Sequence, residues 1–441
     1  MTKFTKVVTR ISISFALFIV FDGGVINVQD QSDISQLRGC TSFTGTISII
    51  GTKLISLSIP KIQALQGTFT VQYNQYLTSF SLPDLKSASN LIFTQNKVLS
   101  AINVPRLKAV TTFNINSAPR LRALSFPVGL NSIENFEIAD TAIELVKGVV
   151  ASRVSSLGLL RNVNMRSLAL PDLLSAESLE IIGNGRGNFQ FEAISLSLLG
   201  QGNFKNLVST YFPSLDKVTS SLTYMENSFT SLSLPKLSEI GGTLTISSNP
   251  RLETVSLPEL SHIDEDLIIE NNQNLVKIDG FDKLYQIDGK AEISGDISTA
   301  LFPSLEVVGR GANVESSSSS VGCNGFDNLR VGDVKVNKID CSLDADKKDY
   351  SDVQETITKS DDHHSKPANS SIIFDTQEPA TDQKQEHTNT NSEVKQQQNI
   401  YIANMNGADK INLFGQVKGH KLLSPIWAFE EFHMLMESED N

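Results

Sequence analysis

Residues 233–260 read SLPKLSEIGGTLTISSNPRLETVSLPEL, and this stretch contains one complete repeat of the chain. It opens and closes on the phrase Ser-Leu-Pro-x-Leu, whose prolines Pro235 and Pro258 lie 23 residues apart. Between them stand the alternating triplet Leu244-Thr245-Ile246 and the residue Asn249. Self-similarity at a fixed period of roughly 20–50 residues is the sequence signature of a repeat architecture. Each of these three marks recurs along the chain.

The proline mark recurs at gaps of about 22 residues or about twice that spacing, and nine of the 14 prolines follow it. An α-helix does not tolerate proline in its interior, and the runs between the prolines are short, so a helical repeat is excluded. The prolines in this series are Pro60, Pro83, Pro105, Pro127, Pro171, Pro213, Pro235, Pro258 and Pro303.

The triplet mark predicts one short strand per repeat, because alternating apolar and polar residues form a strand with one buried face. Stacked repeats of this kind form parallel sheets. The sequence therefore predicts an all-β fold, a right-handed parallel β-solenoid of about twelve coils of about 22 residues over 30–345. The triplets begin at Ile47, Phe69, Leu91, Phe113, Phe136, Leu157, Leu179, Leu222, Leu244 and Leu267.

The asparagine mark predicts a structural ladder at the bends of the coils. Asparagine side chains hydrogen-bond neighbouring backbone groups at turns, and a stack of them would satisfy the peptide groups that each bend buries. A binding ridge is the alternative interpretation. The series consists of Asn74, Asn96, Asn162, Asn184, Asn206, Asn227, Asn249 and Asn272, with Asp140 in the same column.

The two ends of the chain differ from the repeats. Residues 1–24 have a basic start and an apolar run over 11–21, which predicts a secretory signal peptide. Residues 30–40 are expected to form a short cap helix. Residues 346–398 are polar and predict a disordered linker, whereas 399–441 contain a possible short amphipathic helix. The formal net charge of −12 argues against nucleic acid or an anionic membrane as partner.

Three cysteines allow one disulfide bond in an oxidising compartment. Cys323 and Cys341 are the predicted pair, because both lie at the end of the repeats. Cys40 would then be free, buried or paired between molecules. Asn369 begins the one clear glycosylation sequon, Asn369-Ser370-Ser371.

Several phrases together resemble one protein family. The opening DISQLRGCTSFTGTISIIG at 33–51, the repeated SLPxL units, and VGCNGF at 321–326 with KIDCS at 338–342 are similar to fungal cell-wall organisation proteins with receptor-L-domain-like, leucine-rich-like repeats. This family includes the yeast "extracellular mutant" wall proteins and sporulation-specific spore-wall relatives. The resemblance implies a secreted glycoprotein of the cell wall, the outer face of the plasma membrane or the spore wall.

The resemblance also implies a glycosylphosphatidylinositol (GPI) anchor. Such anchors need a hydrophobic C-terminal tail. The longest apolar stretch near this terminus is 422–429, and the chain ends in an acidic segment, 437–441, so no anchor signal is visible.

No motif for catalysis, a cofactor or a metal stands out, and we expect none of the three. An acidic group at Asp264, Glu265, Asp266 and Glu270 is conceivable as a weak calcium site, but a solvated face is favoured. The run 183–188 is rich in glycine and predicts a turn rather than a phosphate loop, since no Lys-Ser/Thr follows it. The histidine pair at 363–364 lies beside two aspartates in the predicted linker, and metal binding by this pair is disfavoured.

Recognition of a polymer remains the expected activity. Rows of Ser, Thr and Asn can hydrogen-bond an extended chain, and Tyr73, Tyr76, Tyr211 and Tyr224 are candidate stacking platforms for sugars. Our first hypothesis is a non-enzymatic protein of wall or spore-wall assembly whose solenoid surface binds β-glucan or wall mannoproteins. An extracellular receptor-like module for a peptide or glycan is the alternative. A glycan-active β-helix enzyme is the third.

Overall fold

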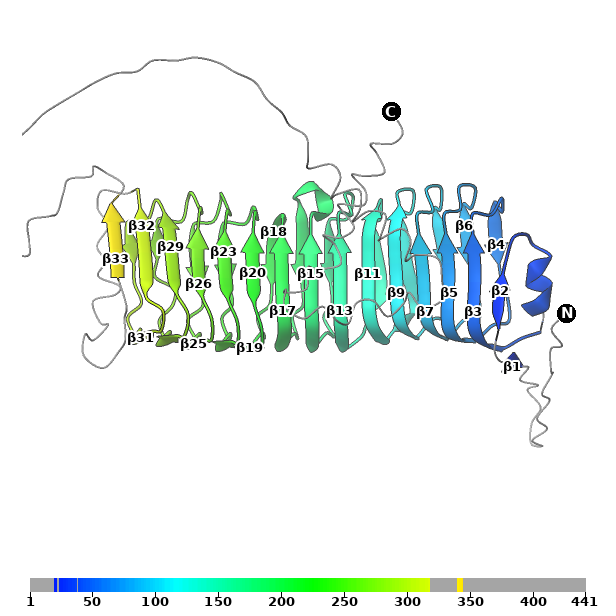
Figure 1. Ribbon diagram of the computed structural model, residues 1–441, viewed down its shortest axis with the longest axis horizontal. Coiled ribbons are helices and arrows are strands. Elements are labelled where there is room, and N and C mark those ends of the chain that lie inside the picture. Colours follow the sequence, from blue (N-terminus) through cyan, green and yellow to red (C-terminus); the bar gives the residue numbers. More distant parts are fainter. Residues whose placement is uncertain (1–19, 22–23, 38, 318–338, 344–441) are drawn as a thin grey trace, which may run out of the picture. The chain divides into compact units, whose positions relative to one another are not determined.

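The computed structural model describes residues 20–21, 24–37, 39–317 and 339–343, and these form a parallel β-solenoid (Figure 1). The predicted fold class is confirmed. The stack has about 13 turns, close to the expected number of about twelve. The predicted pair of Cys323 with Cys341 falls outside the description because Cys323 is not covered, and the same holds for Asn369, the linker and the tail.

A large sheet of 21 described strands runs the length of the stack, and every pairing in it is parallel. Its strands are β1 (Val20–Phe21), β2 (Val25–Asn27), β3 (Ser42–Ile50), β5 (Ala64–Gln72), β7 (Ser87–Thr94), β9 (Ala109–Ala118), β11 (Ser132–Thr141), β13 (Arg153–Leu160), β15 (Ser175–Ile182), β17 (Leu198–Lys205), β19 (Lys217–Val218), β20 (Leu222–Met225), β22 (Glu239–Ile240), β23 (Leu244–Ser247), β25 (His262–Ile263), β26 (Leu267–Glu270), β28 (Gln286–Ile287), β29 (Ala291–Gly295), β31 (Val307–Val308), β32 (Ala312–Ser316) and β33 (Ile339–Leu343).

Shorter strands close each coil behind the large sheet (Figure 1). They are β4 (Ser56–Ser58), β6 (Ser79–Ser81), β8 (Ala101–Asn103), β10 (Ala123–Leu130), β12 (Leu145–Val149), β14 (Ser167–Ala169), β16 (Phe189–Glu192), β18 (Leu207–Tyr211), β21 (Ser231–Ser233), β24 (Thr254–Ser256), β27 (Lys277–Ile278) and β30 (Thr299–Ala300). They pair in parallel sets of two or three.

The proline phrase forms the turn that returns each coil to the large sheet. In SLPDL, the amide of Leu85 donates to the carbonyl of Leu82 at 3.3 Å, and in SLPEL, Leu260 donates to Leu257 at 3.1 Å. Proline therefore stands at the second position of a β-turn, where its fixed φ is already satisfied. The two leucines of the phrase point inward and are buried.

Inward side chains of both strand sets fill a continuous core. Phe69, Phe80, Phe93 and Phe113 form a file whose successive ring centroids lie 5.4, 5.2 and 6.0 Å apart. Burying a phenylalanine side chain stabilises the fold by roughly 1.5–3 kcal/mol. Because each coil contacts mainly its neighbours, the stack gains stability from interfaces between adjacent coils.

The predicted cap segment, 30–40, contains the five-residue 3-10 helix η1 (Asp33–Leu37), whose Ile34 and Leu37 are buried. β1 lies inside the predicted signal peptide and pairs with β3. The glycine-rich run at 183–188 forms a turn around the 3-10 helix η2 (Asn184–Arg186). Within the described ranges, neither helix is long and apolar enough to cross a membrane.

From β19 onward, each strand of the large sheet divides into two short strands at a corner. The corner after β22 is Gly241-Gly242, and the corner after β28 contains Gly289. A Cβ atom on Gly241 would lie 2.5 Å from the carbonyl oxygen of Thr219 in the preceding coil. At the corner after β22, where the coils approach closely, a residue without a side chain is therefore needed.

Candidate functional site

The asparagine side chains form a buried ladder along one bend of the solenoid. Each amide nitrogen donates to a carbonyl of the preceding coil, as Asn162 does to Ile138 at 2.7 Å. Each amide oxygen accepts from the ladder position of the preceding coil: Asn184 accepts from the backbone N–H of Asn162 at 3.0 Å, whereas Asn162 accepts from the side-chain hydroxyl of Thr141 at 2.6 Å. Asn74, Asn96, Asn162, Asn184, Asn227, Asn249 and Asn272 have this arrangement and are at most 3% exposed. These seven residues serve the backbone and leave no amide for a ligand.

The prediction that Asn206 and Asp140 belong to the asparagine column is wrong, because each residue lies one position before the ladder. Leu207 occupies the ladder position and its amide donates to Asn227. Asn206 and Asp140 instead have φ values of 61° and 52°, in a column whose members have positive φ in successive coils. The Asp140 carboxylate binds the Arg161 guanidinium of the next coil through two bonds of 2.8 Å.

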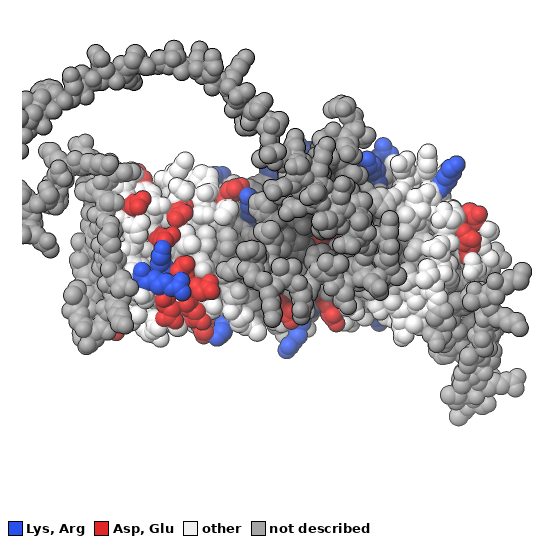
Figure 2. All heavy atoms as spheres, in the orientation of Figure 1, with Lys and Arg blue, Asp and Glu red and all other residues white. Residues whose placement is uncertain are grey.

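The outer face of the large sheet over β3, β5, β7 and β9 is polar and carries no charge at the outward positions of its central columns. One column consists of Ser48, Thr70, Ile92 and Asn114, which the strand register places side by side. A second consists of Thr46, Thr68, Asn90 and Thr112. We call these eight residues, of which only Ile92 is apolar, the polar face. In Figure 2 the described surface over these strands is largely free of Lys, Arg, Asp and Glu.

Two of the four candidate tyrosines lie beside the polar face. Tyr73 and Tyr76 follow β5 directly, and they are 52% and 56% exposed. Tyr211 is also exposed, but it ends β18 in another sheet. The prediction of Tyr224 as a stacking platform is wrong, because this residue is fully buried. Its ring stacks on Phe204 at a centroid distance of 5.0 Å, and burial raises the pKa of its hydroxyl group. The inward position follows from strand parity, since Leu222 and Tyr224 share one face.

Two carboxylates stand in the same outward column at the middle of the sheet. Glu137 on β11 and Glu180 on β15 flank Gly158 on β13, so they are two rungs apart, roughly 10 Å along the sheet. Burial is the main cause that raises the pKa of each carboxyl group. For Glu137, the bond from Asn114 opposes this shift and the charge of Glu180 adds to it. Sequence reasoning missed this pair because neither residue lies in an acidic run.

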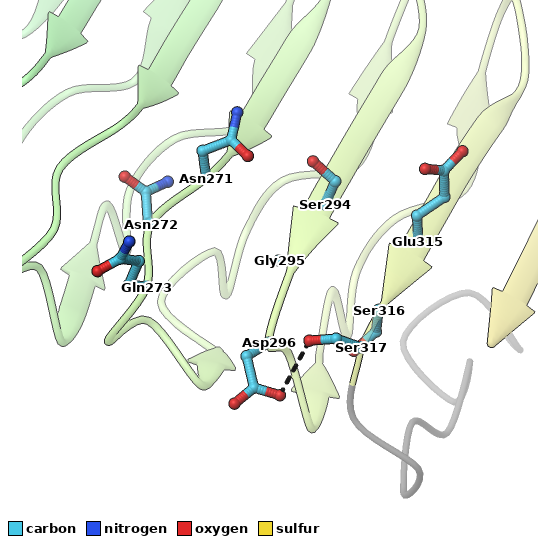
Figure 3. A pocket seen from close by; sticks show the side chains of 9 residues that line it. All are labelled: Asn271, Asn272, Gln273, Ser294, Gly295, Asp296, Glu315, Ser316 and Ser317. Carbon is cyan, nitrogen blue, oxygen red and sulfur yellow. Dashed lines mark hydrogen bonds between the residues drawn. The ribbon is translucent and has the colours of Figure 1, made fainter. Parts of the chain in front are cut away.

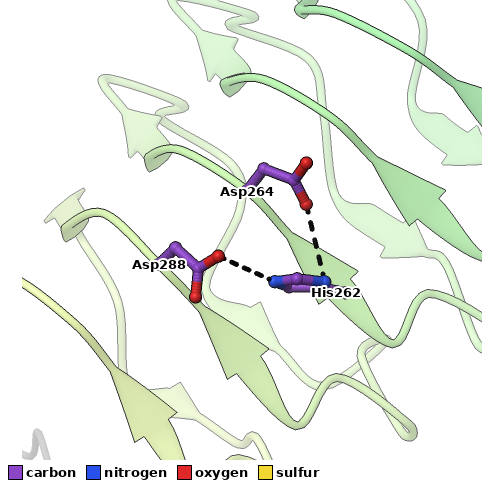
Figure 4. Close-up of side chains that lie close together, drawn as sticks. All are labelled: His262, Asp264 and Asp288. Carbon is purple, nitrogen blue, oxygen red and sulfur yellow. Dashed lines mark hydrogen bonds and ion pairs between the residues drawn. The ribbon is translucent and has the colours of Figure 1, made fainter.

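Charged side chains gather over the later coils of the large sheet (Figure 2). There, His262 on β25 lies between two aspartates (Figure 4). Its Nε2 is 3.1 Å from Asp288 Oδ2, and its Nδ1 is 3.5 Å from Asp264 Oδ1. We call these three residues the histidine cluster.

Of the four acids for which a solvated face is favoured over a weak calcium site, Asp264 alone belongs to a described group of three potential metal ligands. Asp266 instead accepts the backbone N–H of Lys290 at 2.8 Å, and Glu265 accepts from the Thr243 hydroxyl at 3.1 Å. The acidic run is therefore mostly a set of separate contacts along a corner of the sheet.

A hollow of about 560 Å³ lies at the last described coils, between β26, β29 and β32 (Figure 3). Its polar lining includes Asp296, whose carboxylate accepts from the Ser317 hydroxyl at 3.3 Å, and Glu315. Ser316 in the same wall is buried and bonds the backbone of Ile297. These contacts hold successive coils together.

Comparison with known proteins places the chain among fungal wall proteins. It is 31% identical to the cell wall mannoprotein PST1 of Saccharomyces cerevisiae over 316 residues, which cover 70% of each chain. It is 26% identical to the cell wall protein ecm33 of Schizosaccharomyces pombe over 260 residues, 55% of this chain and 61% of that protein. It is 25% identical to the sporulation-specific protein 2 of S. cerevisiae over 327 residues, 72% of this chain and 64% of that protein.

The chain thus spans less than two thirds of two of these relatives. No family model matches it, and no solved structure matches it. The identity to the mannoprotein agrees with the resemblance carried by the repeated phrases. This protein belongs to the fungal cell-wall protein family that includes PST1, ecm33 and the sporulation-specific protein 2.

Proposed function

We propose that the protein is a secreted, non-enzymatic component of a fungal cell wall or spore wall and that its polar face binds β-glucan. The observation that carries this proposal is the uncharged polar surface over β3 to β9 in a member of a wall-protein family. A neutral polysaccharide presents hydroxyl groups and apolar ring faces. Hydroxyl and amide side chains match such a ligand without the desolvation cost of an unpaired charge.

Repetition adds to the strength of such a surface. Neighbouring strands lie roughly 4.8 Å apart, so the second column of the polar face offers hydroxyl and amide groups at regular intervals along the stack, from Thr46, Thr68, Asn90 and Thr112. A polymer that engages one rung is held near the next, and many weak contacts then add up. Tyr73 and Tyr76 supply exposed aromatic rings at the edge of this surface, where a sugar ring can stack.

Wall mannoproteins are the other partner that the family suggests, and attachment by a lipid anchor would hold the solenoid at the cell surface. The relatives include a protein named "Cell surface GPI-anchored protein" in Arthroderma benhamiae, which is 25% identical over 337 residues. The polar face favours β-glucan over a protein as the ligand. The cores of protein interfaces are richer in large apolar and aromatic groups than this surface is.

Genetic complementation tests the function. A strain without the gene should build walls or spores that are more sensitive to wall-degrading enzymes, and the wild-type gene should restore resistance. The double variant Tyr73→Ala, Tyr76→Ala should be secreted normally but restore less resistance, because both rings are exposed and contribute little to the core. Full restoration by this variant would count against the tyrosine edge as part of the binding surface.

A second complementation separates binding from catalysis. A glycosidase needs an acid and a base, and the described carboxylates that best approach such a pair are Glu137 and Glu180. The double variant Glu137→Gln, Glu180→Gln should restore resistance fully. Loss of wall function with normal secretion would favour an enzyme instead.

A further inference from the structure

We propose that the histidine cluster is a binding site for a divalent metal ion of the zinc type. One potential ligand atom from each of His262, Asp264 and Asp288 lies within 4.8 Å of the others. Two ligand atoms on one tetrahedral zinc ion are separated by roughly 3.4 Å, since zinc binds nitrogen and oxygen at about 2.0–2.2 Å. The 3.1 Å separation of His262 Nε2 from Asp288 Oδ2 is close to this value.

The sheet places the three residues where the strands turn the corner. His262 pairs with Gln286 and Ile263 with Ile287, so Asp264 and Asp288 follow as neighbours in adjacent coils. The two carboxylates thus repeat at the spacing of adjacent strands, roughly 4.8 Å, where like charges repel. The residue that the fold places beside both carboxylates is His262, and a cation bound at its Nε2 and at Asp288 would offset this repulsion.

Neighbouring side chains orient the proposed ligands. The Gln286 amide donates to Asp288 Oδ1 at 2.6 Å, which leaves Oδ2 directed at His262. The ring of Tyr285 lies beside the ring of His262, with 6.1 Å between their centroids.

The arrangement assigns a role to each side chain. His262 Nε2 and Asp288 Oδ2 bind the ion, and Asp264 accepts the hydrogen on Nδ1 and supplies the second negative charge. A carboxylate on the far nitrogen of a ligating histidine is a common way to fix its tautomer and orientation. Imidazole is a preferred ligand of zinc, copper and nickel, whereas calcium and magnesium prefer oxygen ligands alone.

The surroundings supply negative charge without blocking the site. Glu239 on the neighbouring strand is paired with Lys217 at 2.7 Å, and Lys290 is paired with Glu292 at 3.4 Å. Glu265 and Asp266 lie in the same corner as Asp264. The side chain of His262 is 25% exposed and those of Asp264 and Asp288 are 42% and 46% exposed, so a cation can reach all three from solvent.

Calorimetric titration of the full-length secreted protein with zinc tests the site. Four proteins are compared: the wild type, His262→Gln, Asp288→Asn, and the double variant His363→Ala, His364→Ala, which removes the other place where a histidine stands beside aspartates. Thermal melting without metal shows whether each variant is folded. A parallel titration with calcium measures how far the acidic residues alone attract a cation.

The proposal predicts one zinc ion bound per chain at the histidine cluster in the wild type and in the double variant. His262→Gln and Asp288→Asn should each weaken zinc binding by at least about tenfold, while calcium binding is weaker than zinc binding and unaffected by His262→Gln. Zinc affinity that survives His262→Gln in a folded protein would overturn the proposal, and so would a wild type that binds no zinc.

Discussion

The side-chain oxygen of Asn249 accepts hydrogen bonds from both the backbone and the side-chain nitrogen of Asn227, at 2.8 and 3.0 Å. The side-chain nitrogen of Asn249 donates to the carbonyl of Tyr224 at 3.1 Å. One buried amide therefore satisfies two backbone groups of the preceding bend. The same relationship repeats along the ladder and explains why asparagine marks the repeat.

Asn249→Ala should lower the free energy of unfolding by about 2–5 kcal/mol, because a buried backbone donor and a buried carbonyl lose their partner. Asn206→Gly is the matched control. Asn206 lies beside the ladder with φ 61°, a conformation that glycine adopts freely, so its loss should cost less than about 1 kcal/mol. Urea denaturation of both variants checks this, and equal losses would show that Asn206 belongs to the ladder after all.

The asparagine column shows how far the sequence alone predicts this fold. The period, the parallel strands and seven of the eight ladder residues follow from the spacing of the marks. Asn206 was misplaced because Leu207 and Asn227 are only 20 residues apart, whereas Asn184 and Leu207 are 23 apart. The positions 184, 206 and 227 look evenly spaced, and one residue of displacement moves a side chain from the core to the surface.

The histidine cluster lay beyond sequence reasoning for a different reason. His262 and Asp288 are 26 residues apart, more than one nominal repeat, and they meet because the corner after β25 and the corner after β28 stack in register. The acidic run around Asp264 was visible in the sequence, but the direction of each side chain depends on the corner. Nothing in the sequence next to His262 indicates that its side chain contacts aspartates from two coils.

Glycine substitutions test the close packing of successive coils. Gly67 has φ +122°, and a Cβ atom there would lie 2.1 Å from the carbonyl oxygen of Gly45. Gly67→Ala should therefore destabilise the protein strongly, by more than about 3 kcal/mol, since neither backbone can move without breaking the sheet. Gly51→Ala is the control: Gly51 also has positive φ, +62°, but nothing lies within 4 Å of its Cβ position.

The expected cost at Gly51 is only about 1 kcal/mol for the left-handed conformation itself. Thermal melting of the two purified variants measures both costs. Similar melting temperatures would mean that conformation, rather than the distance between coils, decides the need for glycine at Gly67.

Glu137 predicts a specific dependence of stability on pH. Burial raises the pKa of its carboxyl group above the ordinary value of 4.5, so the folded protein holds this proton more tightly than the unfolded chain. Its contribution to stability is therefore largest below pH 4.5 and declines as the pH rises through the raised pKa. Glu137→Gln should remove that decline and gain in stability relative to the wild type between pH 4.5 and 7.

Glu134→Gln on the same strand is the control, since Glu134 is exposed. Denaturation curves at several pH values give the comparison. If the difference in stability between Glu137→Gln and the wild type does not change with pH, the Glu137 carboxyl group is not desolvated in the folded protein.

Sedimentation with insoluble β-1,3-glucan shows directly whether the polar face binds this polymer. Secreted wild-type protein is sedimented with the polymer beside two double variants that place carboxylates in outward positions of the large sheet. One is Ser48→Glu, Thr112→Glu on the polar face, and the other is Thr223→Glu, Thr245→Glu on later coils.

We expect the wild type and Thr223→Glu, Thr245→Glu to sediment with the glucan, whereas Ser48→Glu, Thr112→Glu should stay in solution. A wild type that remains in the supernatant, or two double variants that bind equally, would contradict the proposed binding of β-glucan.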